Sequence, residues 1–354
     1  ISNSGLWRVL WYSLIGLSAI ALYAGALRTA GIEWARIRWS LIGVYVVAYV
    51  WWFFANGIII DRVSVLWSFA IFLTVASVGR PWREWVRSAG DLSLFVAMWL
   101  AYDESRGIAD GLGMPIQVES VRDLDRFLFF GADPVVELQA AFHRTEVAER
   151  IVNGEAVLRT VTDVQWYDVV GSFVYYSHFI VPPIVIGALW LINRHQWVRY
   201  MRRFATLLFG ACVMFILLPT APPWMAAGGT NRVGLDLEAL PPLSRHTGVG
   251  WRYVGLGSFV QAWDTGRDWA NQVAAMPSLH SAFALFVVVF FWPWVRNPWA
   301  RVAMLAYPLA MAVALAYFAE HYIVDAIAGW LLVGASFWLW NRIEVWLATR
   351  SVPI

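Results

Sequence analysis

The sequence predicts an all-α, polytopic membrane helical bundle of about nine spans. Three observations predict this class. The chain is 60% hydrophobic and only 14% charged, whereas soluble domains have roughly 25% charged residues. Its mean hydropathy is +0.58, and apolar runs long enough to cross a bilayer recur along its whole length. Many of its 24 tryptophans stand near the ends of these runs, which is typical of the aromatic belts at membrane interfaces.

Nine apolar runs are predicted to span the membrane. The fourth is the weakest, because it is short and is flanked by Asp91, Asp103 and Glu104, and we interpret it as a short or tilted span. The nine runs are Leu6–Leu27, Ser40–Ile60, Val63–Gly79, Leu92–Tyr102, Phe173–Ile192, Phe204–Pro219, Leu279–Val295, Val302–Phe318 and Ile323–Trp340.

Arginines orient these spans, since the chain contains no lysine and all 26 basic residues are arginine. Short connections rich in arginine are normally cytoplasmic, and in a nine-span arrangement the five short segments with two or more arginines fall on one side. We therefore expect a plasma-membrane protein with its long polar insertions on the extracytoplasmic side. The arginines concerned are Arg28, Arg36 and Arg38; Arg80, Arg83 and Arg87; Arg194, Arg199, Arg202 and Arg203; Arg296 and Arg301; and Arg342 and Arg350.

Two polar insertions, 103–166 and 225–277, interrupt the spans. In the first, Asp133-Pro134 is a typical helix start, and the amphipathic stretch Val135–Ile151 is predicted to be a helix that lies in the interface or packs on the spans. The second is rich in Gly and Pro and is predicted to be an irregular lid. We divide the chain into N-terminal spans (1–90), a membrane domain that includes both insertions (91–341) and a cytoplasmic tail (342–354).

The first chemically informative segment is Ala274–Ala282, where the second insertion returns to the membrane. Pro277 and Ser278 are favourable helix-start residues, which places His280 in the first helical turn. Unpaired backbone N–H groups at such a start favour a bound phosphate.

The second segment is Glu320–Gly329. His321 and Asp325 are four residues apart and are predicted to share one helix face. A carboxylate there can accept a hydrogen bond from one imidazole nitrogen and leave the other free to attack phosphorus.

The predicted topology brings the two segments together, because His280 and His321 each begin a span on the same outer side. Either motif alone is unremarkable, but ionisable side chains at membrane depth usually indicate function. Two histidines and a carboxylate suit a double displacement at phosphorus, with one histidine as nucleophile and the other as general acid and base.

These motifs resemble those of the type 2 phosphatidic acid phosphatase superfamily, P-S-G-H followed by S-R-x5-H-x3-D. Pro277, Ser278 and His280 match the first, with Leu279 in place of Gly; His321 and Asp325 match the second. The resemblance implies a six-helix catalytic core. It also implies that His321 is the phosphohistidine nucleophile, that His280 is the acid and base, and that Asp325 orients His321.

The chain departs from the phosphatases at their phosphate-binding residues. Ala314 and Leu315 stand where S-R is expected, and K-x6-R-P is excluded without lysine. The closer resemblance is to the inositol phosphorylceramide synthase-like subgroup, over about residues 90–341. It is carried by Pro277–His280, by His321, Tyr322, Asp325, Ala328 and Gly329, by Tyr176–Phe179 with Pro182, and by Pro219–Trp224.

Substrate contacts are assigned to His178, Ser278 and Tyr176. An interhelical hydrogen bond is the alternative for His178, and packing is the alternative for Tyr176. Glu320 is expected to be solvated. Arginine suits bidentate phosphate binding, and we assign this role to Arg252 and Arg267 among candidates that the sequence does not separate. The other candidates are Arg126, Arg144, Arg232 and Arg245.

The predicted function is transfer of a phospho-headgroup, such as phosphoinositol, from a phospholipid to an acceptor alcohol, with release of diacylglycerol. A lipid phosphate or polyprenyl (pyro)phosphate phosphatase is the alternative; a proton-coupled transporter, a scramblase and a membrane scaffold are further rivals. We expect a phospholipid or glycolipid substrate, no cofactor, no metal and no nucleic-acid partner. The sequence leaves the oligomeric state open.

Overall fold

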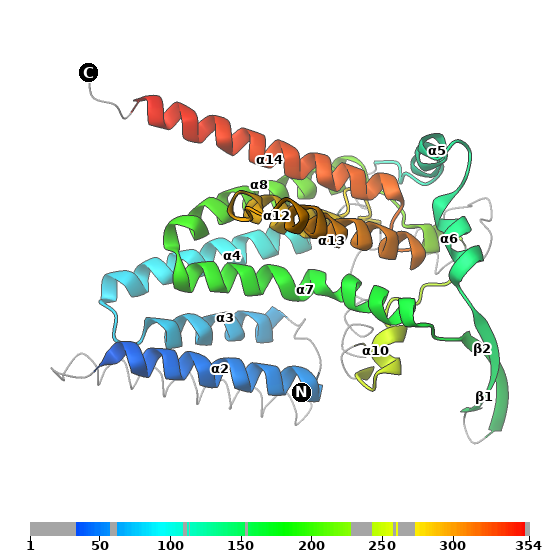
Figure 1. The fold of residues 1–354 in the computed structure, drawn as a ribbon, viewed down its shortest axis with the longest axis horizontal. Helices are drawn as coiled ribbons and strands as arrows, with labels where there is room; N and C mark the ends of the chain where they lie inside the picture. Colours follow the sequence, from blue (N-terminus) through cyan, green and yellow to red (C-terminus); the bar gives the residue numbers. More distant parts are fainter. Residues whose placement is uncertain are drawn as a thin grey trace. The chain divides into compact units, whose positions relative to one another are not determined.

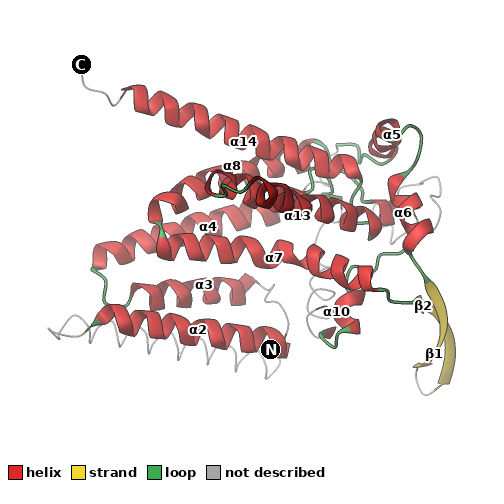
Figure 2. Cartoon of the chain, in the orientation of Figure 1, coloured by secondary structure: helices red, strands yellow, loops and turns green. Residues whose placement is uncertain are grey.

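The computed structural model describes residues 33–56, 62–108, 112, 114–152, 155–227, 243–257, 260 and 273–350. This part of the chain contains twelve α-helices and one β-hairpin (Figures 1 and 2). The chain divides into two compact units, residues 1–100 with 256–269, and residues 101–255 with 270–354.

The first unit contains α2 (Trp34–Asn56) and α3 (Arg62–Ser77), which lie side by side (Figure 1). The Tyr45 hydroxyl donates to the Ser68 carbonyl at 3.0 Å, and Arg38 Nη1 donates to the Val78 carbonyl at 3.2 Å. The chain then turns at Gly79, whose φ of +72° favours glycine, into α4 (Trp82–Ile108), which continues into the second unit.

The second unit is built on five apolar helices: α7 (Trp166–Ile192), α8 (Arg194–Leu217), α12 (Leu279–Phe291), α13 (Pro298–Tyr317) and α14 (Ile323–Arg350). The short α12, continued by the 3₁₀ turn Trp292–Trp294, packs against all four of the others (Figure 1). As the central helix of this unit, α12 has the other four helices around it.

A buried polar network joins α8 to α14. Arg203 is 2% exposed, and its guanidinium donates to both carboxylate oxygens of Glu344 at 2.9 and 3.0 Å and to Asn341 Oδ1 at 2.8 Å. Arg199 adds a further hydrogen bond to Glu344 at 3.1 Å. Because a buried cation is costly unless paired, these contacts fix how α8 and α14 are positioned against each other.

Five of the predicted spans correspond to helices that are long and apolar enough to cross a membrane: α2, α7, α8, α13 and α14. The spans predicted at Val63–Gly79 and Leu279–Val295 form the shorter apolar helices α3 and α12. The fourth lies within the longer, more polar α4, and Leu6–Leu27 lies outside the described residues. The protein is an integral membrane protein, and the count of nine spans stays a prediction.

The first insertion differs from the predicted helix Val135–Ile151. The helix α6 covers only Pro134–Phe142, with Asp133 as N-cap, and is followed by β1 (Thr145–Val152), which pairs antiparallel with β2 (Glu155–Thr162), Thr145 opposite Thr162 (Figure 2). Both strands are rich in Val, Thr and Ile, which favour strands. The amphipathic pattern of Val135–Ile151 did not reveal that its second half pairs with a β-strand that follows directly.

In its described residues, the second insertion contains little regular secondary structure, as predicted. It contains α9 (Pro223–Ala226) and α10 (Val249–Tyr253). Thr220 pairs with Gln117 on one side and with Ala274 on the other. These bridges join both insertions at the segment that leads into α12.

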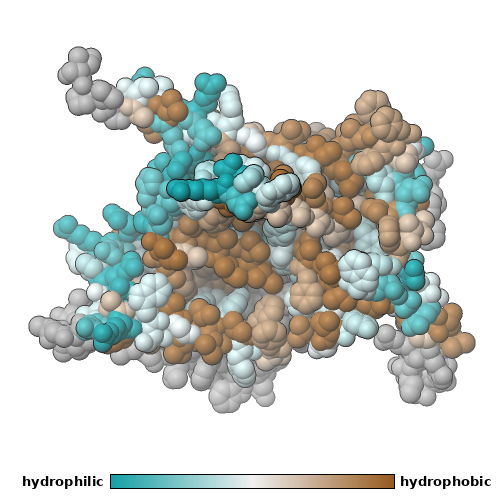
Figure 3. Space-filling model, in the orientation of Figure 1, coloured by the Kyte–Doolittle hydropathy of each residue, from teal (hydrophilic) through white to brown (hydrophobic). Residues whose placement is uncertain are grey.

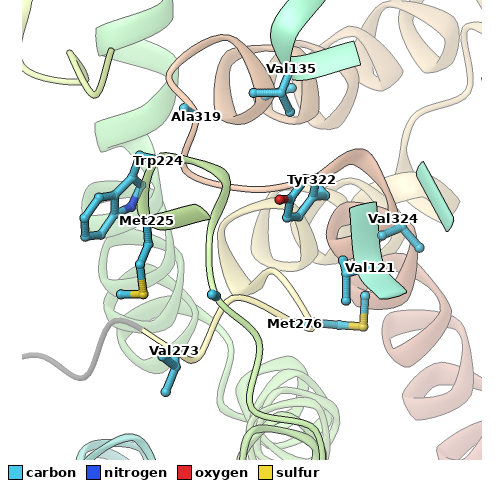
Figure 4. Close-up of a cluster of buried hydrophobic side chains, with 11 residues drawn as sticks. Val121, Val135, Trp224, Met225, Val273, Met276, Ala319, Tyr322 and Val324 are labelled. Atoms are coloured by element: carbon cyan, nitrogen blue, oxygen red, sulfur yellow. The ribbon is translucent and has the colours of Figure 1, made fainter. Parts of the chain in front are cut away.

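A cluster of buried apolar side chains lies behind this junction (Figure 4). It joins α5 (Glu119–Leu128) through Val121, α6 through Val135, and the loop before α12 through Met276. Tyr322, adjacent to His321, is 1% exposed within it. The cluster therefore fixes the backbone on both sides of the candidate site.

Candidate active site

His280 lies in the first turn of α12, as the sequence predicts. The helix begins at Leu279, and the N-cap Ser278 accepts a hydrogen bond through Oγ from the Ser281 N–H at 3.4 Å. Ser278 is fully buried. The capping bond fixes the turn that carries the imidazole.

His321 contacts Asp325, but not in the predicted manner. His321 Nδ1 lies 3.3 Å from Asp325 Oδ2, yet α14 begins only at Ile323, so the two residues do not share a helix face. The chain leaves α13 through Ala319, at φ +57°, and His321 stands in the turn before α14. Asp325 reaches back from the first helical turn and also accepts from the Tyr322 N–H at 3.0 Å.

A second buried carboxylate supports this turn from α5. Asp125 accepts hydrogen bonds from the N–H groups of Ile323 at 2.9 Å and Val324 at 2.7 Å, and so caps the start of α14. Burial raises the pKa of Asp125 to about 6. Nothing local in the sequence around Asp125 indicates this contact, which spans 198 residues of chain.

The two predicted motifs are joined directly. The Ser278 N–H donates to the Asp325 carbonyl at 2.9 Å, and the rings of His280 and His321 have centroids 5.6 Å apart. A Cβ on Gly329 would lie 2.5 Å from the Ser278 carbonyl oxygen. Glycine at 329 therefore lets α14 approach the start of α12.

Gly329→Ala should lower thermal stability by about 1–3 kcal/mol, because backbone atoms at Ser278 must move to admit the methyl group. Gly334→Ala is the matched control on the same helix, since its Cβ would meet nothing within 4 Å; it should stabilise by about 0.5–1 kcal/mol. Thermal unfolding in detergent measures both. Equal effects of the two substitutions would contradict the close approach of α14 to α12.

His178 lies beside His280, where the sequence analysis assigned it a substrate contact. The two rings stack with centroids 4.0 Å apart, and Tyr175 stacks on His280 at 4.9 Å. Tyr176 is fully buried and contacts Tyr175 and Trp251 edge-on. The structure thus brings His178, His280, His321 and Asp325 together and places Tyr176 one layer behind them.

The candidate arginines have different positions. Arg252 is exposed on α10, and Arg144 is exposed before β1. Arg126 is exposed on α5, with its guanidinium 4.0 Å from Asp123. Arg232 and Arg267 lie outside the described residues. Among the candidate arginines that the structure describes, only Arg245 has a largely buried side chain. It lies beside the turn that carries His321.

Arg245 forms a two-pronged ion pair with Glu320, the residue before His321. Its Nη2 donates to Glu320 Oε2 at 2.9 Å and its Nε donates to Oε1, and its guanidinium lies 4.4 Å from the centroid of the Trp224 ring. The expectation that Glu320 is solvated is wrong: Glu320 is 7% exposed. It stands in the turn between α13 and α14 rather than on an outer helix face.

A second polar cluster holds the Arg245 segment in place. The His246 and His143 rings contact each other in a tilted arrangement, with centroids 4.3 Å apart. His246 Nε2 lies 3.8 Å from Asp168 Oδ1, which accepts from the Tyr317 hydroxyl at 2.6 Å. Burial, with His143 alongside, lowers the pKa of His246 to about 4. His246 therefore packs as a neutral imidazole near neutral pH.

This cluster should make stability depend on pH. The unfolded chain binds a proton at His246 near pH 6.5 but the folded chain only near pH 4, so the free energy of unfolding should fall as pH falls between these values. Asp125, with its raised pKa, contributes the opposite slope between about pH 4 and 6.

The comparison of wild type with His246→Asn isolates the histidine contribution. The asparagine keeps a donor toward the Ser244 carbonyl, which His246 Nδ1 contacts at 2.9 Å. The wild-type protein should lose more thermal stability than His246→Asn on acidification from pH 6.5 to 4. His195→Asn, at an exposed histidine on α8, should follow the wild type; parallel curves for wild type and His246→Asn would contradict the assignment.

No group of three or more His, Cys, Asp or Glu side chains suited to a metal ion occurs among the described residues. The polar groups that converge here are two imidazoles backed by one carboxylate, with a third imidazole stacked behind. Such a set suits nucleophilic and acid–base chemistry at a phosphorus or carbonyl centre.

The comparisons with known proteins agree with this chemistry. The sequence pattern of the PAP2 superfamily matches residues 140–339, a range that contains all four of these residues. No curated protein and no solved structure matches the chain.

Proposed function

The chain belongs to the PAP2 superfamily of membrane lipid phosphatases and phosphotransferases, and from this premise we propose that it transfers a phospho-headgroup between lipid-linked alcohols. The donor is a phospholipid such as a phosphoinositol lipid, the acceptor is an alcohol, and diacylglycerol leaves. The finer assignment, to the inositol phosphorylceramide synthase-like subgroup, is part of this proposal. So is the placement of the site on the extracytoplasmic face of the plasma membrane.

The observation that carries the proposal is the convergence of His280, His321 and Asp325. Asp325 Oδ2 lies beside His321 Nδ1, and a proton held between them leaves the Nε2 lone pair of His321 available for attack. The adjacent His280 ring supplies an acid on the same centre. His321 and Asp325 are buried, which limits the access of bulk water to the nucleophile.

The reaction has two balanced steps. In the first, His321 Nε2 forms a bond to phosphorus as the bond to the diacylglycerol oxygen breaks, and His280 donates its proton to that oxygen. In the second, His280 accepts the proton of the acceptor hydroxyl, whose oxygen bonds to phosphorus as the bond to His321 breaks. His280 ends protonated and His321 free, so the enzyme is ready for another cycle.

Arg245 is proposed to replace the missing phosphate-binding residues. Ala314 and Leu315, at the positions of the phosphatase S-R pair, are buried and apolar. Arg245 is a largely buried cation, with 17% of its side chain exposed, and Glu320 holds it beside the turn that carries His321. Burial lowers the pKa of Arg245, but the ion pair with Glu320 raises it on balance. Charge stabilisation is usually the largest single contribution to such a reaction. We infer that the phosphate takes one edge of the guanidinium as Glu320 retains the other.

Arg245→Gln should lower kcat/KM by about 10²–10³-fold, since one charged donor to the transition state is lost. Arg245→Lys should recover part of the activity, because it keeps the charge but not the fork. Glu320→Gln breaks the same ion pair but leaves the arginine, so it should cost much less. Headgroup-transfer kinetics and thermal unfolding would be measured for each variant.

Arg296→Gln, at an exposed arginine before α13, is the control for a general loss of positive charge. Equal losses in Arg245→Gln and Glu320→Gln, with equal destabilisation, would show that the pair is a structural contact and would reject the phosphate role.

Product analysis on the purified protein tests the function itself. Phosphatidylinositol and phosphatidic acid would each be supplied, with and without alcohol acceptors. Diacylglycerol released from phosphatidylinositol without free phosphate, and dependent on an acceptor, is the expected result. Free phosphate from phosphatidic acid or a polyprenyl phosphate would instead identify a phosphatase and reject headgroup transfer.

A further inference from the structure

The outward side of α5 is apolar, which is unusual for a helix in a polar insertion. Leu124, Phe127 and Leu128 are all exposed, and the turn after the helix exposes Phe129 and Phe130. Phe127 is 79% exposed and Phe130 is fully exposed. Side chains of this size rarely gather on a surface that faces water alone.

Several contacts fix the orientation of α5, so these apolar side chains are held on its outer side. On the inner side of α5, Val121 joins the apolar cluster and Asp125 caps α14. Arg122 Nε donates to Asp133 Oδ2 at 2.8 Å, which ties the start of the helix to the chain after the turn. At the turn, Phe130 has φ +55° and Gly131 φ +96°, and the Gly131 N–H donates to the Arg126 carbonyl at 2.7 Å.

The charged side chains of α5 begin where its apolar ones end. At 100° per residue, Leu128, Leu124 and Phe127 follow the buried Val121 and Asp125 in turn around the helix. Asp123 comes next, about 40° beyond Phe127, and Glu119 and Arg126 lie farther round, with Arg126 opposite Leu124. Asp123 and Arg126 are exposed. This is the pattern of a helix that lies flat in a membrane interface with protein on one side, lipid on the next and water beyond.

The height of α5 also matches the membrane interface. The 28 residues of α14 extend about 42 Å, more than the roughly 30 Å of the hydrocarbon layer. Its charged residues other than Asp325 stand at the far end, at Arg342, Glu344 and Arg350. The end at Ile323 therefore lies close to one membrane boundary, and α5 is bonded to this end.

The apolar side of α5 continues the lipid-facing surface of the second unit. α14 exposes Leu331 and Trp338 on its outer face. Figure 3 shows hydrophobic surface over α5, at the upper right of the view, beside that of the helix bundle. A leaflet that surrounds α14 would thus meet α5 as well.

We propose that α5 and its C-terminal turn, residues 119–131, are a membrane-inserted element, with Phe127, Leu128 and Phe130 buried in the leaflet next to the active site. This inference goes beyond headgroup transfer and does not depend on the identity of the donor lipid. One consequence is that the same helix touches both the leaflet and the turn that carries His321, because Asp125 caps that turn.

Fluorescence quenching in bilayers tests the proposal. The buried Cys212 would be replaced by Ala, and Cys introduced singly by Phe130→Cys, Phe127→Cys or Arg126→Cys, each labelled with an environment-sensitive fluorophore. The full chain would be reconstituted into phosphatidylcholine nanodiscs with or without nitroxide-labelled lipid. Phe130 and Phe127 make few packing contacts, and thermal unfolding would verify that each variant is folded.

Labels at 130 and 127 should lose fluorescence to nitroxides on the upper acyl chain, whereas the label at 126 should be quenched by aqueous iodide instead. The three positions share one short element, so the comparison separates lipid contact from general proximity to the membrane. Weak nitroxide quenching at 130 and 127, no greater than at 126, would overturn the proposal and would indicate that this surface faces water or another protein.

Discussion

Replacing His321 by alanine should lower kcat/KM for headgroup transfer by about 10⁴-fold or more, because the covalent route is lost with its nucleophile. The loss should appear in kcat as well as in kcat/KM, since the interaction is made in the reaction rather than in binding. Initial rates of diacylglycerol release in detergent micelles measure it.

Two controls show whether the loss of activity in His321→Ala is specific to this residue. His195→Ala removes an exposed imidazole at the start of α8, outside the candidate site, and should retain wild-type rates. Thermal unfolding of His321→Ala should stay close to that of the wild type, because Asp325 keeps its bond from the Tyr322 N–H. A folded His321→Ala protein with substantial activity would exclude His321 as the nucleophile.

His280→Ala should show a defect that depends on the leaving group. With a diacylglycerol leaving group, the loss of the general acid should cost about 10²–10⁴-fold. With a p-nitrophenyl phosphodiester, the leaving phenolate needs no proton, so the first step should recover most of its rate. The second step still lacks its base, and a burst of nitrophenol followed by slow turnover is expected.

The burst separates the roles of the two histidines. His321→Ala should give no burst with either donor, because no covalent intermediate forms. Stopped-flow absorbance on matched protein concentrations provides the comparison. An equal loss of the first-step rate for both donors in His280→Ala, with no burst of nitrophenol, would contradict the acid role and would favour a role for His280 in substrate binding alone.

Local patterns in the sequence predicted the parts of the site that depend on local structure. The start of α12 at Leu279, with Ser278 as N-cap, follows from residue preferences at helix ends. The apolar runs predicted the approximate positions of α7, α8, α12, α13 and α14, because length and hydropathy are enough for that purpose. The approach of His280 to His321 followed from their predicted placement at the same side of the bundle.

Contacts between segments that are far apart in the sequence could not be predicted from local patterns. Asp125 and Ile323 are 198 residues apart, and no local feature indicates that a carboxylate on α5 caps α14. Arg245 was one of six candidate arginines, and only the fold shows that it pairs with Glu320. The helix predicted at Val135–Ile151 ended early because a strand partner, invisible to helical periodicity, lies directly after it.

The family match supports the chemistry but not the substrate. The PAP2 superfamily includes both hydrolysis and transfer, and in the proposed mechanism the choice between them depends on whether an alcohol or water reaches the phosphohistidine. The buried position of His321, 7% exposed, and the apolar residues at Ala314 and Leu315 favour an acceptor delivered through the membrane. The product analysis above decides this question independently of the catalytic assignment.

The most direct test of the central claim is to identify the residue that carries phosphorus during turnover. His280→Ala would be mixed with a headgroup-labelled p-nitrophenyl donor and quenched in alkali, which preserves phosphohistidine, and then digested and analysed by mass spectrometry. If His321 is the nucleophile, one labelled peptide is expected, modified at His321, and it should be absent from the His321→Ala, His280→Ala double variant. Label on another residue, or a burst without any covalent adduct, would contradict it.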